Sequence, residues 1–83
     1  MNRQQLRETL IAELANIAPD IDAATVEDHV HLRDTYELDS MDALNLLAAI
    51  HQRLGIVIPE AEYAHMHRLA DMLDYLEQAS AQQ

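Results

Sequence analysis

At residues 37–42 the chain reads ELDSMD, and from Ser40 it continues as SMDALNLLAAIHQRL without a glycine or proline. This second stretch, residues 40–54, repeats its apolar residues at helical spacing and predicts an amphipathic helix. Asp39 and Ser40 are both good N-cap residues, because their side-chain oxygens accept the free N–H groups of a first helical turn. Ser40 is thus expected at a helix N-terminus, where the helix dipole would stabilise a phosphate. The face expected to point to the core consists of Ala43, Leu46, Leu47, Ile50 and Leu54.

The composition indicates one small helical domain. The chain has 83 residues, 49% of them hydrophobic, with one glycine and no cysteine, phenylalanine or tryptophan. Its frequent leucine, alanine, methionine and glutamate favour helix over sheet. No apolar run reaches the roughly 20 residues of a membrane-spanning helix. No basic n-region followed by an apolar h-region opens the chain, so we expect no signal peptide. We therefore expect an all-α single domain over residues 1–83, located in the cytoplasm and without membrane insertion.

Charge restricts the choice of partners. Fifteen Asp and Glu oppose five basic residues, all of them arginine, for a formal net charge of −10. Nucleic acid is a poor partner, because neutralising its phosphates needs a basic face. A protein with a basic patch would instead be attracted by the opposite field. In the central segment Arg33 is the single base, and it opposes Asp20, Asp22, Glu27, Asp28, Asp34, Glu37, Asp39 and Asp42.

The first half of the chain predicts a helix and a long connection. The helix is expected over residues 2–17, with Asn2 and Gln5 at capping-box spacing. Residues 18–39 then form a long first loop, pinned to the core by scattered apolar residues, with one short helical turn around residues 23–29. The apolar stripe of the first helix is Leu6, Leu10, Ile11, Leu14 and Ile17.

The second half predicts a short helix and a final long one. Gly55 suits the left-handed position after a helix end, and residues 56–58 are expected as an extended buried connector. A short third helix is expected over residues 59–65 and the last helix over residues 68–79, followed by a frayed tail at residues 80–83. The predicted architecture is therefore a small bundle of three main helices plus one short third helix.

Three segments carry a resemblance to a known family: LDSMD at residues 38–42, IVIPE at residues 56–60 and DYL at residues 74–76. Together they resemble the acyl carrier protein family. The segment LDSMD at residues 38–42 resembles the family's Asp-Ser-Leu attachment motif. The segment IVIPE at residues 56–60 resembles its hydrophobic-Pro-acidic segment, and DYL at residues 74–76 resembles the Asp-Tyr-aliphatic triplet of its last helix. The resemblance covers most of the chain. It implies an acyl-carrier-like helical bundle with 4′-phosphopantetheine attached covalently to Ser40, and with Asp39 as the motif neighbour.

The same resemblance implies a carrier rather than an enzyme. A separate phosphopantetheinyl transferase would move the group from coenzyme A to the Ser40 hydroxyl, and the thiol of the group would hold an acyl chain as a thioester. The other partners would be acyl-loading and acyl-processing enzymes with basic docking patches. We expect a monomer that catalyses nothing itself and works in fatty acid, polyketide or related biosynthesis.

Some positions depart from the family pattern. Met41 replaces the commoner leucine, a change that keeps side-chain volume. Glu37 stands where glycine is frequent, and it would cost about 1 kcal/mol if the position needs a positive φ. The second helix is also less acidic than in fatty-acid carriers, since its later polar residues are Asn45, His51, Gln52 and Arg53. These departures indicate a specialised carrier rather than the housekeeping one.

A second face of the helix over residues 40–54 is a candidate docking surface. It lies beside the core stripe, starts at Ser40 and is mostly apolar with acids at its top. An apolar strip rimmed by acids suits an enzyme with a basic collar around an apolar groove. The alternative is that Met41 and Leu44 widen the core face. The residues predicted to bind partners are Asp39, Met41, Asp42, Leu44 and Ala48.

Other functions stay open on the sequence. The load could be an aminoacyl group, as in stand-alone aminoacyl or D-alanyl carrier proteins, which also use a serine at this helix start. In a different class, the chain would be an acidic helical adaptor without cofactor, with Ser40 only as a cap. A small enzyme ranks last, because no pair of nucleophile and base is evident.

No metal site is expected. The two His-x-His pairs, at residues 29–31 and 65–67, have their imidazoles two residues apart, a spacing that points them away from each other on a helix. The chain also has no cysteine to complete a tetrahedral site.

Overall fold

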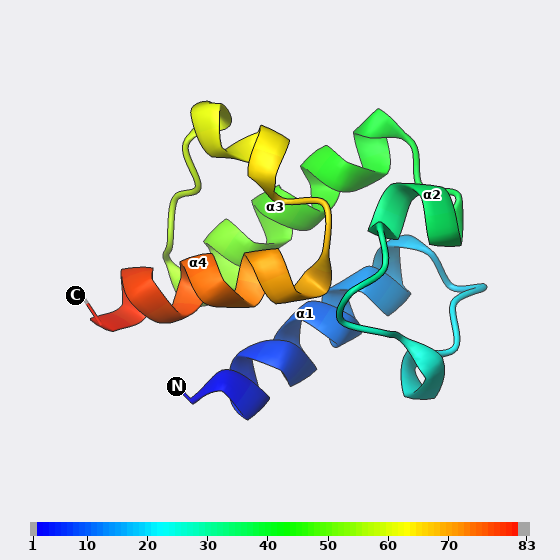
Figure 1. Ribbon diagram of the computed structural model, residues 1–83, viewed down its shortest axis with the longest axis horizontal. Coiled ribbons are helices and arrows are strands. Elements are labelled where there is room, and N and C mark those ends of the chain that lie inside the picture. The colour runs from blue at the N-terminus through cyan, green and yellow to red at the C-terminus, as the bar shows by residue number, and fades with distance from the viewer. Residues whose placement is uncertain (1, 82–83) are drawn as a thin grey trace.

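The computed structural model describes residues 2–81 and shows three long helices around one core (Figure 1). The helix α1 (Arg3–Ile17) contacts both α3 (Ser40–Leu54) and α4 (Leu69–Ala81). No strand occurs within residues 2–81, and the predicted all-α class is confirmed. The connections contain three short helical pieces, which are the 3₁₀ helix η1 (Ala23–Thr25), α2 (Leu32–Tyr36) and the 3₁₀ helix η2 (Glu60–His65).

The core is built from leucines and isoleucines of all three long helices. On α1, Leu6, Leu10 and Leu14 are almost completely buried, while the other two members of the predicted stripe are half-buried. Because α1 contacts both other long helices, its stripe lies at the centre of the molecule. The remaining buried apolar residues are Val26, Leu32, Leu38, Leu46, Ile50, Ile56, Ile58, Leu69, Ala70, Met72, Leu73 and Leu76.

The predicted start of α1 is confirmed. Asn2 is the N-cap, and its Oδ1 accepts the Gln5 N–H at 2.8 Å while Gln5 Oε1 accepts the Asn2 N–H at 3.0 Å. At its outer face Arg3 binds Asp74 of α4 at 2.9 Å. That hydrogen bond raises the pKa of the Arg3 guanidinium above its ordinary value. Since both groups are exposed, we expect little stability from the pair.

The prediction for residues 18–39 is partly wrong, because it missed α2. A turn does form inside the predicted range, at Ala23–Thr25, but a further helix spans Leu32–Tyr36. Contacts outside the segment stabilise it: the Leu32 N–H donates to the His67 carbonyl at 2.8 Å, and the Leu32 side chain is buried. Local sequence alone does not predict so short a helix, because helices of this length are marginal without tertiary contacts.

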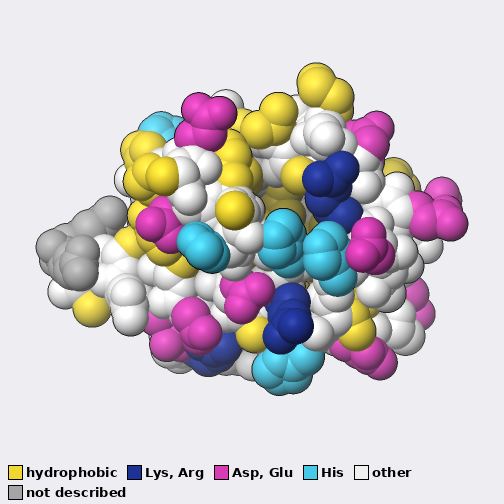
Figure 2. All heavy atoms as spheres, turned by 45° about the horizontal axis from the view of Figure 1, so that its top comes forward, with side chains coloured by type: hydrophobic (Ala, Val, Ile, Leu, Met, Phe, Trp, Pro, Cys, Tyr) yellow, Lys and Arg dark blue, Asp and Glu magenta, His cyan; other side chains and the backbone are white. Residues whose placement is uncertain are grey.

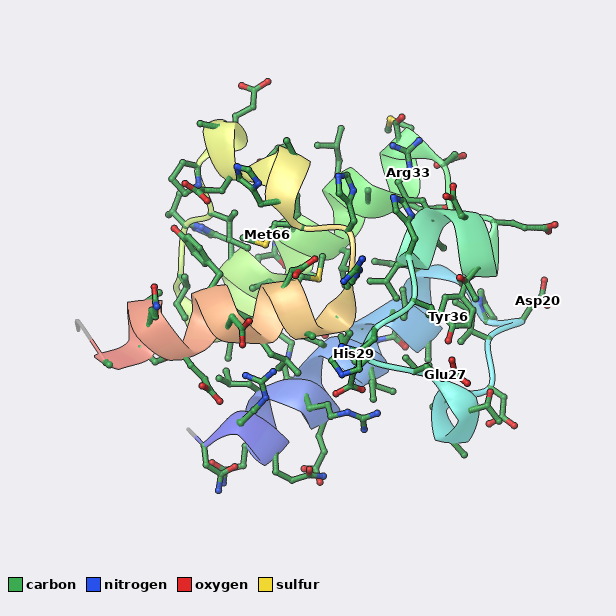
Figure 3. The ribbon with its side chains drawn as sticks, viewed as in Figure 1. Asp20, Glu27, His29, Arg33, Tyr36 and Met66 are labelled. Atoms are coloured by element: carbon green, nitrogen blue, oxygen red, sulfur yellow. The ribbon has the colours of Figure 1, made fainter. Side chains whose placement is uncertain are left out.

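The long connection is fixed to α1 and α4 by side-chain and main-chain hydrogen bonds. Arg7 of α1 donates through Nε to Asp28 Oδ1 at 2.9 Å and through Nη2 to the Val26 carbonyl at 3.1 Å. The Asp28 carbonyl in turn accepts the Ala70 N–H at 2.9 Å. Near the other end of the connection, Tyr36 and Glu27 lie side by side (Figure 3), and the Tyr36 hydroxyl accepts the Glu27 N–H at 3.1 Å. The connection is thus an ordered part of the fold.

The segments after α3 follow the prediction with three adjustments. Gly55 is left-handed, with φ 69°, as expected. The connector buries Ile56 and Ile58, but Val57 between them is 63% exposed. The short third helix is of the 3₁₀ type and begins at Glu60, one residue later than predicted.

The last helix starts at Leu69 and runs to Ala81, two residues beyond the predicted end. Residues 80–81 are therefore helical rather than frayed, and the rest of the predicted tail, residues 82–83, lies outside the described residues. Within residues 2–81 no helix has both the length and the apolar character needed to cross a bilayer.

The predicted core face of α3 is only partly buried. Leu46 and Ile50 are buried as expected, but Ala43, Leu47 and Leu54 are half-buried. Ala43 and Leu47 are accessible because they line an apolar cavity beside α3.

Candidate functional site

At the start of α3 the cap is Asp39, not Ser40. Asp39 Oδ1 accepts the Asp42 N–H at 2.8 Å, and Asp42 Oδ2 accepts the Asp39 N–H at 3.3 Å. These two reciprocal bonds form a capping box. Ser40 is the first residue of the helix, and its side chain takes no part in the cap. The hydroxyl is therefore available for other chemistry.

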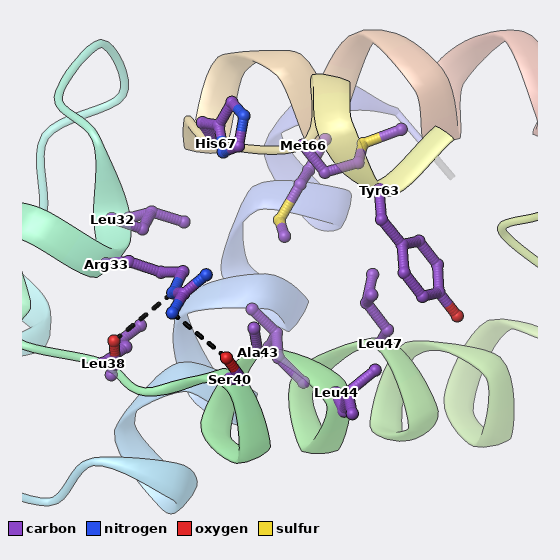
Figure 4. A pocket seen from close by; sticks show the side chains of 12 residues that line it. Leu32, Arg33, Leu38, Ser40, Ala43, Leu44, Leu47, Tyr63, Met66 and His67 are labelled. Atoms are coloured by element: carbon purple, nitrogen blue, oxygen red, sulfur yellow. Dashed lines mark hydrogen bonds between the residues drawn. The ribbon is translucent and has the colours of Figure 1, made fainter. Parts of the chain in front are cut away.

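The Ser40 side chain is exposed and lies beside a guanidinium. Arg33 of α2 donates through Nη2 to Ser40 Oγ at 3.2 Å, and its Nε lies 3.5 Å from the Leu38 carbonyl oxygen (Figure 4). The single base of the acidic central segment thus contacts the one hydroxyl that the sequence singled out. The sequence alone does not predict this contact, because Arg33 and Ser40 are seven residues apart and lie in different helices.

A reversal of the chain at Glu37 brings Arg33 and Ser40 together. Glu37 has φ 56° and ψ 39°, a left-handed conformation, and its N–H donates to the Arg33 carbonyl. The Leu38 N–H donates to the same carbonyl at 3.1 Å. The sequence predicted a cost if this position required a positive φ, and the structure shows that it does. Glutamate adopts this conformation at a cost of about 1–2 kcal/mol.

An apolar cavity of about 240 Å³ opens beside Ser40 (Figure 4). It lies between α2, α3 and η2 and reaches the first turns of α4. Ser40 and Arg33 are among its few polar lining residues, together with His67 and Tyr63. The residues around it are Leu32, Arg33, Leu38, Ser40, Ala43, Leu44, Leu46, Leu47, Tyr63, Met66, His67 and Met72.

The residues predicted to bind partners lie on the surface. Met41 is 63% exposed and Leu44 47% exposed, so they do not simply widen the core. Ala48 and Asp39 are also exposed, whereas Asp42 is half-buried. Figure 2 shows hydrophobic side chains gathered along the upper part of that view of the molecule. The exposed apolar face that the sequence predicted on α3 is present.

Two of the four histidines in the His-x-His pairs contact each other in the structure. His31 and His67 stack on each other with ring centroids 4.7 Å apart, and His31 Nδ1 accepts the Asp34 N–H at 3.3 Å as the cap of α2. Among residues 2–81, no three His, Asp or Glu side chains gather as a metal would require. His31 and His67 instead join the start of α2 to the segment before α4, a contact that depends on tertiary structure and does not follow from the sequence alone.

Comparison with known proteins agrees with the geometry. Residues 4–76 match the family described as phosphopantetheine attachment site. An acyl carrier protein of Campylobacter hominis is 29% identical over 89% of this chain and 87% of its own length. Acyl carrier proteins of Acidothermus cellulolyticus and Micrococcus luteus are 25% and 24% identical, covering 87% and 86% of this chain and 86% and 88% of their own lengths.

The family match extends over nearly the whole described fold, from α1 to the buried part of α4. It includes the capped start of α3, the exposed serine and the cavity beside it. This chain therefore belongs to the acyl carrier protein family, whose prosthetic group is 4′-phosphopantetheine.

Proposed function

We propose that Ser40 is the attachment residue and that the protein carries acyl intermediates as thioesters on 4′-phosphopantetheine. The strongest support comes from the surroundings of Ser40. Its side chain is exposed, makes no capping hydrogen bond and lies beside an apolar cavity. The prosthetic group supplies the thiol that forms the thioester. The chain has no cysteine, so it offers no sulfur of its own for this chemistry.

The residues around Ser40 suit a hydroxyl that a visiting enzyme activates. Its polar neighbour Arg33 donates a hydrogen bond and does not act as a base. The two nearest acids, Asp39 and Asp42, use their side chains to cap α3. Among residues 2–81, none of these neighbours of Ser40 is therefore placed to remove its proton. We propose that separate enzymes attach the group and load the acyl chain.

The cavity supports an acyl load over an aminoacyl one. Its walls are mainly leucine and methionine side chains, and burying alkyl groups against them is favourable by about 0.8 kcal/mol per methylene. A charged aminoacyl group would lose solvation in such a space without a partner. The departures from the family pattern at Glu37 and along α3 support a specialised carrier in fatty acid, polyketide or related biosynthesis. We also infer that the protein is a monomer and is located in the cytoplasm.

The exposed face of α3 is the proposed docking surface for these enzymes. It consists of Met41, Leu44 and Ala48, with Asp39 and Asp42 at the end next to Ser40. An enzyme with a basic rim around an apolar groove would be steered by the acids and held by the apolar contacts.

Intact-mass measurement tests the attachment directly. The purified protein is incubated with coenzyme A and a phosphopantetheinyl transferase of broad specificity, and one phosphopantetheine should be added per chain. Ser40→Ala should gain nothing. The chain contains one other serine, Ser80, so Ser80→Ala is the matched control and should gain the full mass. Addition to Ser40→Ala would show that the assignment is wrong, and no addition to the wild type would favour the adaptor function.

A further inference from the structure

Arg33 differs from most of the other arginines in having no carboxylate partner. Within residues 2–81, Arg3, Arg7 and Arg53 each form an ion pair with Asp or Glu, but Arg33 forms none. Its hydrogen bonds go to two neutral oxygens, Ser40 Oγ and the Leu38 carbonyl. This is unexpected in a segment as rich in acids as residues 20–42. The guanidinium keeps donors free for an anion.

The position of this guanidinium is set by the fold. Arg33 lies in α2, which is attached to the rest of the protein by the buried Leu32 side chain and by the hydrogen bond from Leu32 to His67. The left-handed Glu37 then turns the chain back, so that α3 begins beside α2. Arg33 and Ser40 are thus held together from two elements, and both line the same cavity.

We infer that Arg33 is a positioning residue for the phosphodiester of the prosthetic group. The inference rests on the proposed attachment at Ser40. A phosphate esterified to Ser40 Oγ is bonded to the very atom that Arg33 Nη2 contacts at 3.2 Å, so its free oxygens lie within reach of the same guanidinium. Hydrogen bonds between arginine and phosphate are charge-assisted and directional, and the planar guanidinium offers two parallel donors.

The local charge gives a reason for such a contact. A phosphodiester adds a negative charge beside Asp39 and Asp42, in a chain that already carries a formal charge of −10. The positive charge of the Arg33 guanidinium, which already contacts Ser40 Oγ, can offset this negative charge. By holding the phosphate beside the cavity, it would direct the start of the arm along the cavity rather than freely into solvent.

Phosphorus NMR on the holo protein tests the inference. Holo forms of the wild type, Arg33→Gln and Arg33→Lys are compared, with Arg68→Gln as control. Arg68 also lacks a carboxylate partner among the described residues, but it does not line the cavity. The ³¹P resonance of the phosphodiester should shift in Arg33→Gln, return part of the way in Arg33→Lys, and stay unchanged in Arg68→Gln. Added salt should move the wild-type resonance toward that of Arg33→Gln, because it weakens the ion pair.

A second measurement needs no variant. The ¹H–¹⁵N resonance of the Arg33 guanidinium should change between the apo and holo wild type, while that of Arg68 should not. A purely structural role for Arg33 would change the stability of the apo variant and leave the ³¹P resonance where it was.

The outcomes separate this inference from the proposed function. Identical ³¹P resonances in the wild type and Arg33→Gln, or a guanidinium signal unaffected by modification, would overturn the role of Arg33 and leave Ser40 as the attachment residue. Addition of the group to Ser40→Ala, or none to the wild type, would overturn the attachment itself, and with it the role of Arg33.

Discussion

Asp39 and Asp42 cap α3 reciprocally, each accepting the main-chain N–H of the other at 2.8 and 3.3 Å. The two acids that flank the proposed attachment site therefore stabilise the first turn of α3 through their side chains, and the Ser40 side chain between them does not. This division of roles means that the serine can be modified without the loss of a helix cap. Because the capping side chain is that of Asp39, Ser40 does not serve as the N-cap of α3.

The two positions should respond differently to alanine. Asp39→Ala should lower the free energy of unfolding by about 0.5–2 kcal/mol, the usual cost of losing an N-cap side chain. Ser40→Ala should change it by less than about 0.5 kcal/mol, because its side chain makes no capping hydrogen bond and its contact with Arg33 is exposed to solvent. Urea melts of the two apo variants measure the difference. Equal losses would mean that Ser40 shares the capping role in solution.

Replacing Glu37, which has a left-handed backbone conformation, with glycine should stabilise the protein. Glu37→Gly should raise the free energy of unfolding by roughly 0.5–1 kcal/mol, because relief of about 1–2 kcal/mol at positive φ exceeds the flexibility that glycine adds to the unfolded chain. Gly55→Ala is the matched change in the opposite direction, at φ 69° after α3. A Cβ there meets no atom within 4 Å, so any loss reflects backbone conformation rather than a clash.

Chemical denaturation of both variants checks the signs. Glu37→Gly should unfold at higher urea than the wild type and Gly55→Ala at lower. A destabilised Glu37→Gly would indicate that the glutamate side chain contributes something beyond the conformation of the turn.

The elements with a clear local signal could be predicted from the sequence. α1 and α3 have capping residues and a regular apolar stripe, and their bounds match the prediction closely. α2 has neither, since its stability depends on Leu32 and His67, which are far apart in the chain. Val57 was predicted to be buried but is exposed, and here too the local sequence does not decide the outcome. An alternating segment buries every second residue, and three consecutive apolar residues do not show which face is inside.

In the candidate site, too, some features follow from the local sequence and others depend on tertiary structure. The position of Ser40, Asp39 and Asp42 at the start of α3 could be predicted from the sequence, because capping residues and a regular apolar stripe mark that start. The contact of Arg33 with Ser40 depends on the left-handed turn at Glu37. Glutamate is an unusual residue at such a turn, and nothing local indicates that the chain reverses there. The cavity likewise depends on how η2 and α4 pack against α3.

Three leucines of α3 should differ in their contribution to stability. Leu46 is 3% exposed, and Leu46→Ala should cost about 2–5 kcal/mol. Leu47 was expected to be equally important, but it is half-buried against the cavity, so Leu47→Ala should cost less than Leu46→Ala. Leu44→Ala should cost least, at 47% exposure. Urea melts give the order, and a Leu44 variant as unstable as the Leu46 one would show that the surface face is core in solution.

The exposed face of α3 leads to a prediction about association with the transferase. Leu44→Asp should keep its fold and lower kcat/KM for phosphopantetheine transfer roughly tenfold, since removing a useful interface contact costs about 1–2 kcal/mol. Ala12→Asp places the same charge at an exposed position on α1 outside this surface, and should behave like the wild type.

We expect the charges of the acids beside Ser40 to influence association with the transferase over a longer range than apolar contacts do. Asp42→Asn removes the charge but keeps an oxygen to accept the Asp39 N–H, so the cap is preserved. This variant should slow association chiefly at low salt, because fewer charges steer the encounter, and the rate should depend less on ionic strength. Stopped-flow measurements over a range of salt concentrations, together with a melt of each variant, separate docking from folding. If Leu44→Asp and Asp42→Asn are folded and modified at the wild-type rate, the transferase docks elsewhere on the protein.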